Sequence, residues 1–212
     1  VNDVLALKDA DLGISMGSGS EATKAVADLV LIDNAFSSLP AVVNEGRKVI
    51  NNVERVSKLF VTKTSYAVLL TFVVGILDSP FPFIPRQLTL IGTFSIGVPG
   101  FFLALAPEVD LIRPGFLRRV LWFTVPAGLA IGSATLAAYE ASLEITELPL
   151  AEARTLVTVT LLALGLVVLA VTSRPLRPWK AGLVALMGLS YAVVFAVPFL
   201  RDFFELELFW SE

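Results

Sequence analysis

Residues 59–77 read LFVTKTSYAVLLTFVVGIL, a stretch that is apolar and long enough to cross a bilayer as a single helix. A spanning helix needs about 20 apolar residues, because lipid offers the backbone no hydrogen-bond partners and a helix satisfies its own. Four more stretches of this kind follow, at residues 88–106, 120–139, 155–173 and 181–200. The sequence therefore predicts a mainly α membrane protein, with a transmembrane domain of five spans over residues 59–200.

The composition supports this class. Hydrophobic residues make up 56% of the 212 positions and charged residues only 17%, which is too apolar for an ordinary soluble domain. The chain has no cysteine and no histidine, so thiol and imidazole chemistry are excluded. Any chemistry must use carboxylates, hydroxyls, amides, lysine or arginine.

The charged residues between the spans predict the orientation. Two of the connections are basic and carry Arg113, Arg118, Arg119, Arg174, Arg177 and Lys180. The connection between the third and fourth spans is acidic and carries Glu140, Glu144, Glu147 and Glu152. Because basic loops stay in the cytoplasm, we expect the N-terminal segment inside and the acidic tail, residues 201–212, outside. We expect a multi-pass protein of the plasma membrane.

The polar end of the chain, residues 1–37, predicts a small α/β segment. Helical and strand patterns alternate there, with a helix over 2–9, a strand over 12–16, a helix that Ser20 caps, and a strand over 29–32. This order suits half of a doubly wound sheet. From about Ser38 apolar residues recur at helical spacing, so residues 38–58 form a stalk helix that enters the first span without a breaker. Such a helix would carry movement into the bilayer.

Several segments of the sequence, in the polar end and in the first two spans, carry a family resemblance. VNDVLALKDADLGISMG at 1–17, followed by SEATKAVADLVLID at 20–33, resembles the end of the phosphorylation domain of P-type cation-transporting ATPases. The stalk EGRKVINNV at 45–53, KTSY at 63–66 and IPRQLTLIGTFSIGVPGFFLALAP at 84–107 resemble the stalk and the fifth and sixth membrane helices of these pumps. The resemblance implies a C-terminal fragment whose cytoplasmic segment is haloacid-dehalogenase-like.

The resemblance also implies a chemistry. In the family an aspartate takes the γ-phosphoryl group of ATP while Mg²⁺ neutralises charge, and by similarity Asn2 contacts the phosphoryl group and Asp3 supports the Mg²⁺ site. The alternative is that Asn2 and Asp3 only cap a helix. The phosphorylated aspartate, the nucleotide-binding domain and the first four membrane helices are missing, so we expect the fragment to be inactive alone. Its expected partners are the bilayer, the transported cation and the missing N-terminal part, with no nucleic acid.

Polar groups in two spans are the candidates for a cation path. They are the hydroxyls of Thr64, Ser65, Thr93 and Ser95, with backbone carbonyls freed near Pro99. Calcium pumps place amides and carboxylates at the positions that Thr64, Ala67, Gly92 and Ile96 occupy here, and a divalent cation takes six or more oxygens. The family favours calcium or another metal cation, while a monovalent ion or a proton remains open.

Lys63 lies inside the first span and allows two interpretations. It is either a built-in counter-charge that pairs with a carboxylate on an absent helix, or a residue near the interface whose ammonium reaches water. Two other classes also remain open for the whole chain. A secondary transporter would predict an inverted repeat, and none is visible; a non-catalytic membrane scaffold would keep only the remains of a pump.

Gly128 and Gly132 form a pair of small residues four positions apart in the third span. Such pairs let two helix backbones approach closely in a membrane. The sequence therefore predicts that the third span packs tightly against a neighbouring helix through these glycines.

Overall fold

The computed structural model describes residues 3–207, and the chain divides into two compact units between Lys48 and Val49. The first unit contains the short elements of the polar end. They are α1 (Val4–Asp9), β1 (Ile14–Met16), α2 (Glu21–Val26), β2 (Leu29–Leu31) and the 3₁₀ turn η1 (Phe36–Ser38). Strands β1 and β2 pair in parallel, with Ile14 opposite Leu29.

Local chemistry explains this strand–helix–strand unit. The Thr23 amide donates a hydrogen bond of 3.3 Å to Ser20 Oγ, so Ser20 caps α2 as its sequence position predicts. A Cβ atom at Gly17 would lie 2.8 Å from the Ile32 carbonyl oxygen, so only glycine fits beside the end of β2. Two strands do not identify a larger fold, and the haloacid-dehalogenase-like assignment stays a prediction.

Helix α3 (Leu39–Leu77) is continuous over 39 residues and has no break at Lys58. Asp33 precedes it and organises the turn that leads into it. Its carboxylate accepts hydrogen bonds from the Ser38 hydroxyl at 2.8 Å and the Ala35 amide at 3.1 Å. These bonds hold the pKa of Asp33 below its usual value. The helix belongs to the first unit as far as Lys48 and to the second unit beyond it.

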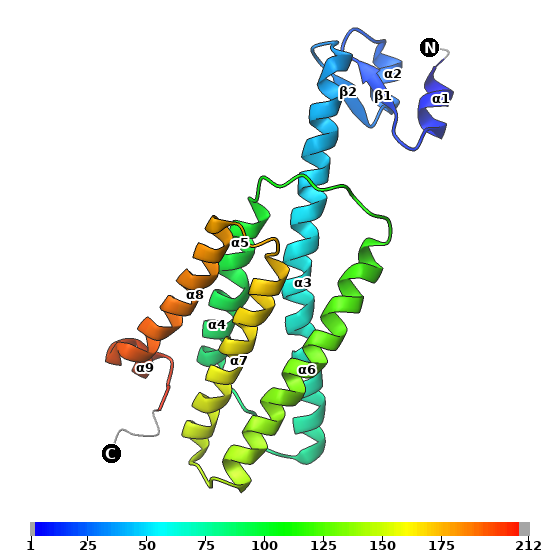
Figure 1. Ribbon diagram of the computed structural model, residues 1–212. Coiled ribbons are helices and arrows are strands. Elements are labelled where there is room, and N and C mark those ends of the chain that lie inside the picture. Colours follow the sequence, from blue (N-terminus) through cyan, green and yellow to red (C-terminus); the bar gives the residue numbers. More distant parts are fainter. Residues whose placement is uncertain (1–2, 208–212) are drawn as a thin grey trace. The chain divides into compact units, whose positions relative to one another are not determined.

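The second unit is a bundle of long helices (Figure 1). After α3 come α4 (Pro85–Gly92), η2 (Thr93–Gly97), α5 (Val98–Ala104), α6 (Phe116–Glu144), α7 (Leu150–Thr172), α8 (Pro178–Ala196) and α9 (Pro198–Phe203). Helix α3 with its 3₁₀ turn, the series α4–η2–α5, α6, α7 and α8 are each long and apolar enough to cross a membrane. The five predicted apolar stretches fall largely within these five helices.

The end of the fifth stretch differs from the prediction. We expected one span over residues 181–200, but α8 ends at Ala196, Val197 is extended, and α9 begins at Pro198. Proline has no amide hydrogen, and its ring clashes with the carbonyl four residues earlier, so it kinks or ends a helix, and here α8 ends before it. The polar tail is also partly ordered, because the Glu207 amide donates to Thr155 Oγ1 at 2.9 Å. Residues 208–212 of the predicted tail lie outside the described part of the chain.

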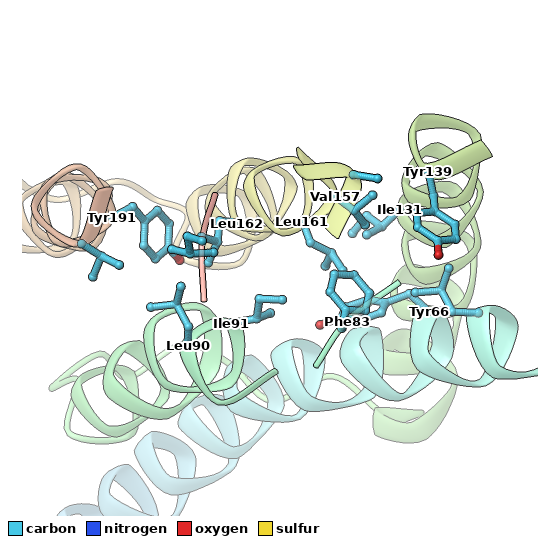
Figure 2. Packing of buried hydrophobic residues seen from close by; sticks show 14 residues of the cluster. Tyr66, Phe83, Leu90, Ile91, Ile131, Tyr139, Val157, Leu161, Leu162 and Tyr191 are labelled. Carbon is cyan, nitrogen blue, oxygen red and sulfur yellow. The ribbon is translucent and has the colours of Figure 1, made fainter. Parts of the chain in front are cut away.

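The centre of the bundle is a cluster of buried apolar side chains from α3, α4, α6, α7 and α8 (Figure 2). Tyr139 is fully buried, and its hydroxyl donates a hydrogen bond of 2.7 Å to the Pro80 carbonyl. In lipid the attraction between helices comes from close packing and such hydrogen bonds rather than from the hydrophobic effect. Shape complementarity along the helix faces therefore controls this assembly.

The predicted glycine contact lies between α6 and α3. A Cβ atom at Gly128 would overlap the Ser65 side chain and lie 3.0 Å from the Thr62 carbonyl oxygen. A Cβ atom at Gly132 would lie 2.8 Å from Leu69 Cδ2. The two backbones approach so closely because these positions have no side chain.

We predict that Gly128→Ala lowers the stability of the full-length protein by about 1–3 kcal/mol, the usual cost of overpacking a tight contact. The measurement is the midpoint of unfolding in detergent. Gly182→Ala is the matched control, because a Cβ atom there meets nothing within 4 Å. Equal shifts for the two variants would show that α3 and α6 do not depend on this contact.

Candidate functional site

The second span is helical from Pro85 to Ala104 but irregular in its middle. Its turn η2 is a π-helix, in which the Val98 amide donates to the Thr93 carbonyl five residues earlier. Pro99 follows, is buried, and has no amide hydrogen to donate. π turns are rare, appear mostly as single turns inside α-helices, and are frequent at functional sites. The wide turn shifts the backbone hydrogen bonds by one residue, and Pro99 donates none. Carbonyl oxygens in this part of the span therefore lack the regular donor of an α-helix.

A small cavity of about 20 Å³ lies beside this turn, between α3, η2, α6 and α7. Lys63 and Ser95 both line it, together with Thr62 and Tyr66. Its volume suits about one water molecule. Two of the predicted path residues therefore share one space.

Ser95 is buried and held by its neighbours. Its hydroxyl lies 3.1 Å from the Tyr191 hydroxyl of α8, within hydrogen-bond distance. A Cβ atom at Gly165 would lie only 2.7 Å from Ser95 Oγ, so glycine in α7 makes room for this hydroxyl. Three helices therefore position Ser95.

The other predicted hydroxyls do not converge on this cavity. Thr64 donates to the Phe60 carbonyl at 3.1 Å and Ser65 donates to the Val61 carbonyl at 2.9 Å, so both bond within their own helix. Thr93 is exposed. Thr64 lines an open groove along α3 that Lys63 also borders. The role of these hydroxyls in a path stays a prediction.

Lys63 extends toward the second span. A Cβ atom at Gly92 would lie 3.1 Å from Lys63 Nζ, so the ammonium occupies space that the glycine leaves open. Between residues 3 and 207, none of the ion pairs involves Lys63. The same residues contain no group of three or more acidic side chains suited to a metal ion.

The predicted phosphoryl residues lie at the start of the chain. Asn2 falls outside the described residues. Asp3 is exposed at the N-cap position of α1, and its side chain makes no capping hydrogen bond. Mg²⁺ in phosphoryl-transfer sites is held by one or two carboxylates together with phosphate and water. Asp3 supplies one exposed carboxylate, and the roles of Asn2 and Asp3 stay predictions.

A buried charge cluster lies where the second span ends, and the sequence analysis missed it. Glu108 has a side chain only 3% exposed, and its Oε2 accepts from Lys180 Nζ at 2.5 Å and pairs with Arg55 Nη2 at 2.6 Å. Asn52, on the same face of α3, donates to the Ala104 and Ala106 carbonyls at 2.8 and 2.9 Å. We call Asn52, Arg55, Glu108 and Lys180 the anchor. It connects α3, the end of α5 and α8.

The sequence held one partial signal for the anchor. Asn52 and Arg55 are three residues apart, so they share a face of α3, but their partners are more than 50 residues away. Lys180 was assigned only a role in orientation. Its complete burial follows from the position of Glu108, which no local pattern reveals.

Comparison with known proteins identifies the family, although no family model matches the chain. The chain is 47% identical to the calcium-transporting ATPase CtpE of Mycolicibacterium smegmatis and 49% identical to CtpE of Mycobacterium tuberculosis, over 98% of its own length in each case. The chain belongs to the P-type cation-transporting ATPases. A probable cation-transporting ATPase of Streptococcus pneumoniae, exp7, is 36% identical over 62% of the chain and 18% of its own length.

As a P-type ATPase sequence, the chain spans 28% of the length of the CtpE relatives. The identity to these relatives over 98% of the chain confirms the predicted family. The five long helices and the transport ATPase relatives together make the chain a multi-pass integral membrane protein.

We predict that Glu108→Gln destabilises this P-type ATPase by about 3–5 kcal/mol, because it removes the buried carboxylate that pairs with Arg55 and is the ion-pair partner of the buried Lys180. The measurement is the unfolding midpoint of the full-length protein in detergent. Asp110→Asn is the control, since Asp110 lies 3.4 Å from Arg55 but has a 67% exposed side chain, and it should cost less than about 1 kcal/mol. A loss no larger for Glu108→Gln would contradict the anchor.

A second prediction concerns Ser95 and Tyr191. A double-mutant cycle of Ser95→Ala and Tyr191→Phe should give a coupling energy of about 0.5–1.5 kcal/mol, as for other hydrogen bonds within membranes. Ser190→Ala replaces Tyr191→Phe in the control cycle, because the Ser190 hydroxyl bonds the Leu186 carbonyl of its own helix. Coupling of the same size in both cycles would refute a direct contact.

Proposed function

We propose that this chain is the membrane part of an ATP-driven cation pump that forms an aspartyl phosphate during transport. The observation that carries the proposal is helix α3, which belongs to the α/β unit at its start and to the transmembrane bundle over the rest of its length. The names of the relatives, calcium-transporting and cation-transporting ATPases, support the same reading.

In this proposal α3 acts on the second span, α4–η2–α5, at two places. The anchor fixes the end of α5 to α3 through Asn52 and Glu108. Deeper in the bundle, Lys63 packs beside Gly92. A shift of α3 would therefore displace the second span at its end, through the anchor, and also near its middle, through the contact of Lys63 with Gly92. The π turn η2 is the part best able to yield, because its backbone hydrogen bonds are already irregular.

The phosphoryl chemistry would take place largely in parts of the pump outside this chain. ATP and Mg²⁺ would bind there, with Asn2 directed to the phosphoryl group and Asp3 adding a carboxylate. The chain alone would be inactive, because a catalytic aspartate and a nucleotide-binding domain would have to come from elsewhere in the pump. We place the first unit in the cytoplasm and the pump in the plasma membrane, as the basic connections favour.

Calcium or another metal cation is the proposed cargo. The described path residues offer hydroxyl and carbonyl oxygens but no carboxylate, so any carboxylate ligands of a divalent cation would come from helices outside this chain. Lys63 would then serve as the counter-charge that faces those carboxylates when the cation has left.

A non-catalytic scaffold and a secondary transporter are the competing functions. Vanadate-sensitive ATP hydrolysis by the purified full-length protein, stimulated by one ion of the alkali or alkaline-earth series, separates a pump from both. Absence of any ion-stimulated hydrolysis would reject the proposed pump.

We predict that Lys63→Met in the full-length pump changes the cation concentration for half-maximal ATP hydrolysis by about tenfold, equivalent to 1.4 kcal/mol. Lys63→Arg is the control, because it keeps the positive charge and should change this concentration by less than about threefold. Unchanged ion-dependent turnover in Lys63→Met would favour the alternative in which the ammonium only reaches toward water.

A further inference from the structure

A large cavity of about 1070 Å³ opens at the end of the bundle where the anchor lies. It is bounded by α3, the connection between α5 and α6, the start of α6 and the end of α7, all within the second unit. Figure 1 shows this connection passing beside α3 on its way to α6. The cavity is distinct from the small space around Lys63 and Ser95, and the proposed pump mechanism does not use it.

The lining of this cavity has an excess of positive charge. Five cationic side chains line it against two carboxylates, Glu54 and Asp110; the five are Arg55, Lys58, Arg113, Arg119 and Arg174. Glu54 is already paired with Lys58 at 2.9 Å and with Arg119 at 2.7 Å. Among the ion pairs of the described residues, none includes Arg113 or Arg174. Both are exposed, so two guanidinium groups are available to an anion.

One wall of the cavity is held in place by Arg119. Its Nη1 donates to the carbonyls of Arg113 and Pro114 at 2.5 Å each, while its Nη2 pairs with Glu54 of α3. The connection that carries Arg113 is therefore tied to both α6 and α3. The backbone at Arg113 is therefore held in place by these contacts.

Apart from Asn51 and Thr172, the rest of the lining is apolar. Leu111 is 75% exposed, and Ile112, Phe123 and Val171 also border the cavity. Trp122, next to Phe123, is 72% exposed, and exposed tryptophans gather at the interface between membrane and water. A small hydrophilic anion has no use for these apolar walls, whereas an amphiphile would contact both them and the guanidinium groups.

We propose that this cavity binds the phosphate headgroup of an anionic phospholipid. The phosphate would lie between Arg113 and Arg174, and the glycerol and upper acyl chains would contact Leu111, Ile112 and Phe123. Basic pockets between membrane helices bind anionic headgroups in this way, and arginine forms strong paired hydrogen bonds to phosphate oxygens.

The test uses the full-length protein in phosphatidylcholine nanodiscs, titrated with phosphatidylglycerol and followed by native mass spectrometry. The double variant Arg113→Gln, Arg174→Gln should weaken phosphatidylglycerol binding about 30-fold, since each basic residue near a membrane surface adds about a factor of five. The matched control is Arg118→Gln, Arg177→Gln, which removes the same charge from the same end but outside this cavity. Arg177 lies 3.5 Å from Glu108 with a 57% exposed side chain, and Glu108 keeps its buried partners Arg55 and Lys180 in this variant. It should weaken binding less than about threefold.

Three results would overturn the proposal. Equal weakening in both double variants would mean that only the overall surface charge attracts the lipid. Binding of phosphatidylglycerol no tighter than that of phosphatidylcholine would mean that no anionic headgroup site exists. Competition by inorganic phosphate at concentrations similar to those of the lipid would assign the cavity to a free anion. None of these readings requires ATP hydrolysis, so they stand apart from the test of the pump.

Discussion

The arrangement of the bundle depends on one carboxylate, that of Glu108. It is removed from water and shared by Arg55 of α3 and Lys180 of α8, which are also buried. A buried ion pair contributes little net stability, because the loss of hydration nearly cancels the attraction, yet a single unpaired member is costly. Helices α3 and α8 and the connection after α5 are therefore held in one arrangement, since any other would separate the charges in a medium of low dielectric constant.

The second span is fixed at both ends and irregular between them. At one end Asn52 donates to the Ala104 carbonyl at the end of α5 and to the Ala106 carbonyl just beyond it, and at the other the buried Gln87 donates to the Glu205 carbonyl at 3.1 Å. Between these points lie the π turn and Pro99. Strain applied to this span is therefore expected to concentrate near Ser95, the buried hydroxyl that α7 and α8 hold from the opposite side.

Sequence patterns predicted the parts of this structure that depend on local order. The five apolar stretches, the alternation around Ser20 and the close approach at Gly128 each follow from neighbouring residues. The anchor could not be predicted, because it joins positions 55, 108 and 180, which no periodicity relates. The end of α8 was predictable from Pro198 but was missed, since hydrophobicity alone continues through it to Leu200.

The anchor also bears on how the molecule is made. Ribosomes release the chain from its start, so Arg55 and Glu108 leave the ribosome well before Lys180 is synthesised. Until α8 is made, Arg55 and Glu108 lack the ammonium that completes the anchor. A nascent chain interrupted before Pro178 therefore has one carboxylate and one guanidinium of this cluster without their third partner.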